Sequence, residues 1–325
     1  MTSPQPFNGP LFIVGMVRSG TKLLRGLLLE NPRVQIPAGE SDLLPLWIDQ
    51  WERYGDLSRR DAFDAFYRQA SGLPYLVAMT RVGFPADPDR WYAACPAYDV
   101  AGVFEGLIRT QLGAGPGDLW GDKTPSYTRH VAQIAHAFPE ARVVHIVRDV
   151  RDYCLSVNKA WGKNRFRAAQ RWSDDVRRAR TDGAALGPRY LEVRYEDLIA
   201  DPGPAMERVC RFAGIEFDPS MLSLSKPSEV AGDAGGMRAV KRDNAGKFRT
   251  RMDASTLRRI EAIAGDVLRD AGYEVEYTGH TRRIGPAQMM VYRLSDAATM
   301  VRGSVRELGW RNALKMSFRT LTMRR

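Results

Sequence analysis

The amino-acid sequence predicts an α/β protein of three layers, in which helices cover both faces of a central, mainly parallel sheet. Three observations predict this class. Short apolar runs at 11–15, 142–147 and 190–194 have the length of strands, and 142–147 is apolar almost throughout, as in a parallel strand buried on both faces. Longer segments with apolar residues at helical spacing lie between the runs. The chain of 325 residues is long enough for one large domain or two small ones.

The N-terminal part of the chain predicts a strand, a tight loop and a helix in succession. The strand covers 11–15, and the helix covers 21–30, where leucines recur at helical spacing until Asn31-Pro32 ends it. A short extended segment follows at 34–36. This arrangement opens many nucleotide-binding α/β folds.

Residues 41–117 predict several helices that prolines interrupt. Large aromatic side chains at helical spacing more often form a core than a ligand site. In this segment they are Trp47, Trp51, Tyr54, Phe63, Phe66, Tyr67, Trp91 and Tyr92.

The rest of the chain continues the alternation of strands and helices. A short strand begins near Asp118 and ends at Gly121, and a helix is expected at about 126–137. Asp149 can cap the helix that follows strand 142–147. Beyond strand 190–194, helices are expected at about 203–213 and 254–270.

Positive charge is concentrated at the C-terminal end. The net charge is +10, and 281–325 contributes +8 of it, from ten Lys or Arg against Asp296 and Glu307. The charge therefore says little about the remainder of the chain, and we expect no nucleic-acid partner. Residues 284–325 are helical in pattern, with apolar residues on one side. This segment can dock its apolar side on the core, which we favour, or lie on an anionic membrane surface.

Some classes of protein are excluded by the composition. No run approaches the roughly 20 apolar residues of a membrane-spanning helix. The polar start at 1–10 lacks the features of a secretory signal, so we expect a cytoplasmic location. The spacing of Cys95, Cys154 and Cys210 indicates buried thiols rather than a disulfide framework or a metal site.

The most informative segment is the loop at 15–22, which reads Gly-Met-Val-Arg-Ser-Gly-Thr-Lys. Backbone N–H groups at a helix N-terminus bind anions, with help from the helix dipole. The two glycines permit close backbone approach. Arg18 adds a fork of donors, and Ser19 and Thr21 add hydroxyls.

The order of residues in this loop differs from that of an ATP-binding Walker loop, G-x-x-x-x-G-K-[ST]. Here Thr21 precedes Lys22. Asp149, which could have held magnesium, follows the basic Arg148 rather than an apolar residue. We therefore predict a P-loop-like fold with an anion loop and no metal.

The stretch from Arg18 to Lys22 resembles the 5′-phosphosulfate loop of the sulfotransferases that use PAPS (3′-phosphoadenosine-5′-phosphosulfate). It is similar to the version with Arg found in tyrosylprotein sulfotransferases and many bacterial members. The resemblance covers about 11–273, more loosely within 41–117. It implies PAPS as donor, PAP as product, and donor binding by Arg18, Ser19, Gly20, Thr21 and Lys22.

A second part of the family's donor site holds the 3′-phosphate. Arg148 at the end of an apolar strand and Ser156 two turns into the next helix resemble it. A strand-end Arg can offer a phosphate two parallel hydrogen bonds. Tyr195, in the sequence Val-Arg-Tyr-Glu-Asp-Leu, resembles the family residue that lies near the nucleotide.

A third part is a late glycine loop that closes over the nucleotide. Asn244, Gly246 and Lys247 resemble this loop, although Phe248 stands where Trp is usual. The resemblance implies that these three residues contact the donor.

Sulfuryl transfer needs a base for the acceptor hydroxyl and cations at the leaving oxygen. Glu40 follows the 34–36 segment, which returns it toward the anion loop, and Lys123 follows a strand. Tyrosylprotein sulfotransferases carry a catalytic glutamate and lysine in similar Gly-Glu and Lys-x-Pro settings, so we expect Glu40 as base and Lys123 with Arg18 at the leaving group. Glu40 could instead cap a helix or pair with an arginine, and Lys123 could lie at the surface or pair with Asp122.

The sequence thus predicts a sulfotransferase domain at 1–280, with 41–117 as a helical insertion on the acceptor side, and a basic tail at 281–325. The acceptor is expected to be a hydroxyl of a carbohydrate, a lipid or glycolipid, or another small molecule. Two alternatives remain: a P-loop kinase that uses Mg-ATP, and a non-catalytic nucleotide-binding protein attached to membranes by its tail. The Thr21-Lys22 order disfavours the first, and the presence of both Glu40 and Lys123 disfavours the second.

Overall fold

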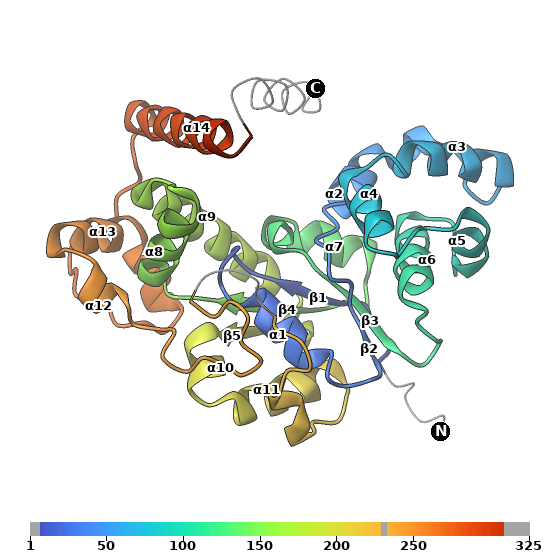
Figure 1. Ribbon diagram of the computed structural model, residues 1–325, viewed down its shortest axis with the longest axis horizontal. Coiled ribbons are helices and arrows are strands. Elements are labelled where there is room, and N and C mark those ends of the chain that lie inside the picture. Colours follow the sequence, from blue (N-terminus) through green and yellow to red (C-terminus); the bar gives the residue numbers. More distant parts are fainter. Residues whose placement is uncertain (1–6, 229–232, 309–325) are drawn as a thin grey trace. The chain divides into compact units, whose positions relative to one another are not determined.

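The computed structural model describes residues 7–228 and 233–308 (Figure 1). The chain forms two compact units. The first comprises the described parts of 1–148 and 175–245, and the second comprises 149–174 and the described part of 246–325. No helix among the described residues is long and apolar enough to cross a membrane.

The first unit is built on a sheet of five parallel strands in the order β2-β3-β1-β4-β5 (Figure 1). The parallel sheet is confirmed, and each of the three apolar runs expected as a strand at 11–15, 142–147 and 190–194 forms one. The strands are β1 (Leu11–Val14), β2 (Val34–Gln35), β3 (Leu119–Lys123), β4 (Arg142–Val147) and β5 (Tyr190–Arg194).

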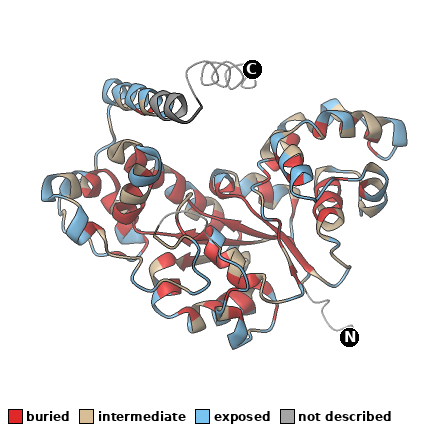
Figure 2. Cartoon of the chain, in the orientation of Figure 1, coloured by how far each residue is buried: buried red, intermediate tan, exposed pale blue. Residues whose placement is uncertain are grey.

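Both faces of this sheet are covered, as the apolar strands require (Figure 2). Alternate residues of β1 enter two different cores: Leu11 and Ile13 face one, and Phe12 and Val14 face the other. The first core contains α1 (Thr21–Leu28), α10 (Tyr195–Ala200), α11 (Pro202–Ala213) and η4 (Pro219–Leu222). The second contains α7 (Val131–Ala137) and the C-terminal half of α9 (Arg165–Ala184).

Residues 41–117 form a succession of helices packed on the second core. Their large aromatic side chains lie inside: Trp47 and Trp91 stack with ring centroids 6.1 Å apart, and Phe66 meets both edge-on. The aromatics in the middle of this segment therefore form a core, as their helical spacing predicts. The elements are α2 (Leu44–Gln50), η1 (Trp51–Tyr54), α3 (Arg60–Ala70), α4 (Pro74–Arg81), α5 (Pro88–Ala94) and α6 (Val100–Leu112).

The structure departs from the sequence predictions in three elements. Strand β3 runs two residues further than expected, so that Lys123 is its last residue rather than a loop residue. The helix expected at 126–137 is divided at His130 into η2 (Pro125–Arg129) and α7. Helix α9 was not predicted, because its many charged residues weaken the apolar pattern.

The second unit is helical and contains α8 (Val150–Trp161), the N-terminal half of α9, α12 (Phe248–Arg251), α13 (Ala254–Asp270) and α14 (Pro286–Leu308). Asp149 caps α8 by accepting a hydrogen bond from the Arg151 backbone N–H, as predicted. The Arg151 guanidinium also pairs with Asp149 and Glu261 at 2.7 Å each. Of the predicted tail, residues 309–325 lie outside the described part of the chain.

Candidate active site

Four of the five parallel strands lead directly into a predicted site residue at their carboxyl ends, and the fifth, β2, precedes Glu40 by a few residues. In sheet order, Glu40 follows β2, Lys123 ends β3, the 15–22 loop follows β1, Arg148 follows β4 and Tyr195 follows β5. Because the strands are parallel, their carboxyl ends share one edge of the sheet, where ligands bind in open α/β sheets. The fold thus gathers residues that are far apart in the chain, such as Arg18 and Tyr195, which are 177 positions apart.

The 15–22 loop turns sharply between β1 and α1. Arg18 and Gly20 have positive φ values of 67° and 93°, and Gly15 donates its backbone N–H to the Thr128 hydroxyl at 2.8 Å. Ser19 is fully buried, and its hydroxyl has no hydrogen-bond partner among the described residues. An orphaned hydroxyl beside a helix N-terminus fits an oxygen-rich anion such as a phosphate. Thr21 begins α1 and is buried.

The other loop cation has a different environment. Lys22 is exposed in the first turn of α1, whereas Arg18 is half-buried. The structure therefore keeps Arg18 closer to the interior of the loop than Lys22.

Arg148 connects the loop to the neighbouring strand ends. Its two terminal nitrogens donate to the backbone carbonyl of Arg18 and to that of Asn244, each at 2.9 Å. Its guanidinium also lies over the Tyr195 ring at 4.6 Å, and the Tyr195 hydroxyl accepts a hydrogen bond from the Asn244 amide at 2.7 Å. The four predicted donor-site residues Arg18, Arg148, Tyr195 and Asn244 thus form one contiguous cluster.

Gly20 is required by this cluster. A Cβ atom at this position would lie 2.4 Å from the Tyr195 ring, so any other residue would displace the tyrosine. The positive φ of Gly20 also favours glycine. Tyr195 therefore packs against both the anion loop and the Arg148 guanidinium.

Three predicted donor-site residues belong to the second unit. Ser156 lies in α8, and Gly246 and Lys247 directly precede α12. Phe248, which stands where Trp was usual, is buried beneath the Arg151 guanidinium at 4.0 Å and donates its backbone N–H to Asp152. The contact of these three residues with a donor stays a prediction.

The two residues expected to carry the chemistry contact each other. Lys123 Nζ lies 2.8 Å from Glu40 Oε1, with the lysine side chain fully buried and the glutamate side chain 38% exposed. Burial lowers the pKa of Lys123, and the adjacent Glu40 carboxylate opposes that shift. Of the alternatives, Glu40 forms no ion pair with an arginine and Lys123 none with Asp122 in the described part of the chain, and Lys123 is not at the surface.

Hydrogen bonds explain why these side chains meet. The segment after Glu40 is held to the turn after β3, because the Ser41 backbone N–H donates to the Thr124 hydroxyl at 2.8 Å. The Ser41 and Tyr127 hydroxyls are 2.7 Å apart, and the Leu44 backbone N–H donates to Tyr127 at 3.0 Å. The backbone on both sides of the ion pair is thus fixed by buried contacts.

Sequence reasoning missed two charged groups behind this pair. Asp122 is fully buried, and burial raises the pKa of its carboxyl to about 6, although the nearby Thr124 and Ser41 hydroxyls oppose the rise. No hydrogen bond of good geometry reaches either Asp122 oxygen from the described residues. Burial lowers the pKa of Arg25 in α1 to about 10, and the Asp122 charge opposes that shift. The apolar pattern around both residues was the available signal, since a charge in such a pattern must be buried or paired.

The cysteines fit the expectation of buried thiols only in part. Near the sheet, His145 lies within β4, fully buried with its Nδ1 2.6 Å from the Tyr190 hydroxyl. Cys154 and Cys210 are buried thiols, whereas Cys95 is half-buried. Within the described residues no group of three or more His, Cys, Asp or Glu side chains could hold a metal ion.

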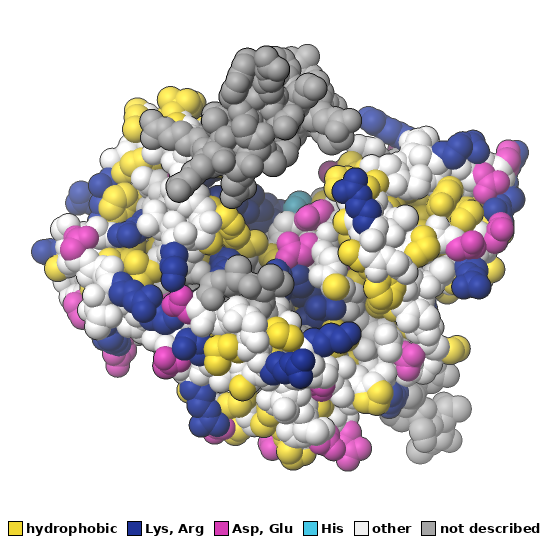
Figure 3. Space-filling model, in the orientation of Figure 1, with side chains coloured by type: hydrophobic (Ala, Val, Ile, Leu, Met, Phe, Trp, Pro, Cys, Tyr) yellow, Lys and Arg dark blue, Asp and Glu magenta, His cyan; other side chains and the backbone are white. Residues whose placement is uncertain are grey.

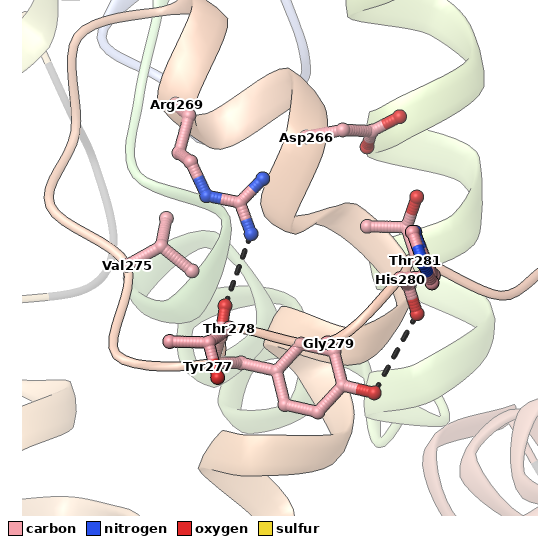
Figure 4. A pocket seen from close by; sticks show the side chains of 8 residues that line it. All are labelled: Asp266, Arg269, Val275, Tyr277, Thr278, Gly279, His280 and Thr281. Atoms are coloured by element: carbon pink, nitrogen blue, oxygen red, sulfur yellow. Dashed lines mark hydrogen bonds between the residues drawn. The ribbon is translucent and has the colours of Figure 1, made fainter.

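A separate pocket of about 440 Å³ lies in the second unit (Figure 4). Arg269 and Tyr277 border it, and the Arg269 side chain donates to the Tyr277 backbone carbonyl at 3.0 Å. It is lined by Asp266, Arg269, Val275, Tyr277, Thr278, Gly279, His280 and Thr281. None of these is a predicted site residue, so the pocket and the carboxyl-edge cluster are different features.

The fold and the site together define a class of protein. A parallel sheet with a glycine loop between its first strand and helix, and with cations at the carboxyl ends of its central strands, is a P-loop-like α/β protein suited to anionic groups. The family model of the sulfotransferase family matches residues 10–219. The chain therefore belongs to the sulfotransferase family, whose members are transferases that typically use PAPS.

Three curated relatives are similar over different lengths. The nodulation protein NoeE of Sinorhizobium fredii is 24% identical, over 84% of this chain and 68% of NoeE. The omega-hydroxy-beta-dihydromenaquinone-9 sulfotransferase Stf3 of Mycobacterium bovis is 24% identical, over 63% of each chain. The human carbohydrate sulfotransferase 3 is 26% identical, over 42% of this chain. The match covers only 34% of the human protein and less than two thirds of the mycobacterial one.

Solved structures support the fold. The sulfotransferase domain from the curacin biosynthetic pathway superposes with a TM-score of 0.54 at 19% identity, covering 84% of this chain and all of that domain. The sulfotransferase domain of the Synechococcus PCC 7002 olefin synthase has a TM-score of 0.51 at 22% identity, covering 85% and 98%. The predicted three-layer, P-loop-like α/β fold is thus confirmed.

Proposed function

We propose that the protein moves a sulfuryl group from PAPS to an acceptor hydroxyl, with Glu40 as general base and with Lys123 and Arg18 stabilising the leaving phosphate. The observation that carries the proposal is the 2.8 Å contact between Glu40 and Lys123 at the ends of β2 and β3. Neighbouring strands lie roughly 5 Å apart, so this pair is one strand away from the anion loop that follows β1. A base and a buried cation beside an anion loop are the groups that the transfer needs.

The donor would lie along the carboxyl edge of the sheet. The backbone of 15–22, with Ser19, Gly20, Thr21 and Lys22, would hold the 5′-phosphosulfate. Arg148, Tyr195 and Asn244 would hold the adenosine and 3′-phosphate end on the β4 and β5 side. Ser156, Gly246 and Lys247 of the second unit are proposed to complete this end on the basis of the family resemblance alone. No metal is required, because the sulfuryl group carries a single negative charge.

The reaction is PAPS + R–OH → PAP + R–OSO₃⁻ + H⁺. The acceptor oxygen forms a bond to sulfur while the bond between sulfur and the bridging oxygen breaks, with the three atoms roughly in line. Glu40 takes the acceptor proton, which it can do because its side chain is partly exposed. Lys123 and Arg18 stabilise the charge that moves onto the bridging oxygen. Because Lys123 is buried, its ammonium group acts in a region of weak solvent screening.

The acceptor is proposed to be a hydroxyl on a carbohydrate, a lipid or glycolipid, or another small molecule. The names of two relatives, a carbohydrate sulfotransferase and a menaquinone-derived lipid sulfotransferase, support this range. The acceptor would enter from the β2 side, where Glu40 leads into the helices of 41–117. We also propose that the protein works in the cytoplasm, at the inner face of the membrane.

Transfer of labelled sulfate tests the proposal. Purified protein is incubated with ³⁵S-labelled PAPS and either the lipid or the water-soluble fraction of a cell extract, in the presence of EDTA, and labelled products are identified by mass spectrometry. We expect a sulfated product in one fraction. Labelled phosphate transfer from Mg-ATP, with no transfer from PAPS, would instead support the kinase alternative. Absence of any transfer from PAPS to both fractions would contradict the proposal.

A further inference from the structure

Helix α14 packs on its own unit through its polar side. Asp296 is buried and accepts a hydrogen bond from the Asn164 backbone N–H at 2.7 Å, and it also pairs with Arg167. The Tyr292 hydroxyl accepts a hydrogen bond from Arg259 at 2.6 Å. Thr299 packs against Gly162. A Cβ atom added at Gly162 would lie 2.5 Å from the methyl carbon of Thr299. These contacts fix which side of the helix faces α8, α9 and α13.

The apolar side of α14 is therefore left uncovered. Met290, Val291 and Leu294 are 53%, 62% and 63% exposed, and Ala287, Ala297 and Ala298 are exposed beside them. Figure 3 shows hydrophobic side chains gathered along α14. These six residues, which we call the apolar stripe, recur at helical spacing on one side. In the sequence, Val301, Val305 and Leu308 continue that spacing. Docking of the apolar side on the core, which the sequence favoured, is thus not observed for the described residues.

The sequence that carries the stripe is strongly basic. Residues 281–325 hold ten Lys or Arg and only two acids. Of these acids, Asp296 is turned inward and paired, so that it does not reduce the positive charge beside the stripe. Arg293 is exposed next to Leu294. An apolar stripe beside an exposed arginine, in a segment whose sequence has ten basic and two acidic residues, matches an anionic membrane surface. Two copies joined through this side would instead bring two strongly basic segments together.

We propose that the apolar stripe of α14 inserts into the headgroup region of an anionic phospholipid bilayer, while its polar side remains docked on the second unit. The proposal rests on α14 and not on sulfuryl transfer, so either can fail without the other. It would hold the protein at a surface where lipid acceptors are present.

Vesicle binding tests this surface. The full chain is sedimented with phosphatidylcholine vesicles that contain about one third phosphatidylglycerol, and with vesicles of pure phosphatidylcholine. We expect binding to the anionic vesicles that is roughly ten-fold or more tighter than to the neutral ones and that weakens at high salt. Leu294→Glu should reduce the binding by roughly ten-fold, because it places a charge in the apolar stripe.

A matched control adds the same charge to the same helix. Gln288 is exposed and lies roughly 120° around the helix from Leu294, outside the stripe. Gln288→Glu should therefore bind nearly as well as the parent, with circular dichroism verifying that both variants remain folded. Equal loss in both variants would show that only net charge matters and would overturn the proposal. So would a lack of binding to anionic vesicles, or a dimer in light scattering that Leu294→Glu dissociates.

Discussion

The side chain of Lys123 is a charged group that is buried next to other charged groups. It is fully buried at the end of a strand, next to Asp122 in sequence and 2.8 Å from Glu40. Arg25 adds a second cation whose charge acts on both Lys123 and Asp122. Buried charges are tolerated when they are paired, so this group of two cations and two acids must be considered together. Changes to one member will affect the others.

Glu40→Gln should remove the base while keeping the shape of the side chain. General base catalysis contributes about 100- to 10,000-fold to a rate, so we expect kcat for transfer to the labelled acceptor to fall by at least about 100-fold. Because Glu40 is placed away from the nucleotide end, the affinity for PAP should change by less than about three-fold. The checks are initial rates and calorimetric titration with PAP. Full retention of kcat would show that another group is the base.

Lys123→Met should also lower kcat, because it removes a cation that stabilises the leaving phosphate. Loss of one stabilising donor costs about 100- to 1,000-fold in kcat in other enzymes. Because the two residues work as a pair, the double variant with Glu40→Gln should be little slower than the slower single variant. Rate effects that multiply in the double variant would indicate that Glu40 and Lys123 act independently.

Asp122 should make the stability of the protein depend on pH. Its pKa of about 6 in the folded state lies above the ordinary value near 4, so the folded protein retains a proton that the unfolded chain releases. As the pH rises from about 4 to 6, the free energy of unfolding should therefore fall by up to about 3 kcal/mol. Above about pH 6 it should stay at the lower level.

Asp122→Asn isolates this contribution. The asparagine cannot ionise, so the variant should not lose this stability as the pH rises. The free energy of unfolding of the variant minus that of the parent should therefore increase from about pH 4 to 6, by up to about 3 kcal/mol at pH 7. Urea unfolding at about pH 4.5 and 7.5 measures the difference. The same difference in stability at both pH values would contradict a raised pKa at Asp122.

At the scale of elements, the anion loop depends on one turn. Gly20→Ala should strain the backbone at a φ of 93° and push Cβ into the Tyr195 ring. Gly113 is a suitable control, because it has a φ of 67° at the end of α6 with no atom within 4 Å of its Cβ position. Gly113→Ala should cost about 1 kcal/mol of stability. Gly20→Ala should cost clearly more and should also weaken PAP binding, as urea unfolding and calorimetry would show. Equal costs in both variants would contradict the packing of Tyr195 on the loop.

The elements also show what local sequence can predict. Strands β4 and β5 and helix α13 have the bounds that their apolar patterns predict, because each buries a regular set of residues. Helix α9 was missed, since it is rich in charged residues and several of its buried residues, such as Gln170, Ser173 and Asp175, are polar rather than apolar. Strand β3 was predicted too short because Asp122 and Lys123 look like loop residues. Their charges act on partners that are distant in the sequence, since Lys123 pairs with Glu40 and the Asp122 carboxylate acts on Arg25.

At the scale of the whole molecule, local motifs were enough to choose candidate residues but not to predict their order along the sheet. The motifs that resemble a donor site are local, so Arg18, Arg148 and Tyr195 could be chosen as candidates by resemblance. The contact between Glu40 and Lys123 depends on the pairing of β2 with β3, which no local pattern specifies. Likewise, the side through which α14 docks depends on Asp296 meeting Arg167 in another helix.

The central claim is that Arg148 and the anion loop hold the two ends of one nucleotide. The contact of Arg148 with the Arg18 backbone places the two within reach of a single ligand. Phosphate recognition by an arginine predicts that PAP binds more tightly than 5′-AMP, which lacks the 3′-phosphate, by about 10- to 100-fold.

Calorimetric titration of PAP and 5′-AMP, in EDTA, into the parent protein and Arg148→Ala is therefore the most direct measurement. We predict roughly micromolar binding of PAP to the parent protein. In Arg148→Ala, the preference for PAP should fall to less than about three-fold while 5′-AMP binding changes little. A preference for PAP that persists unchanged in Arg148→Ala would contradict the account.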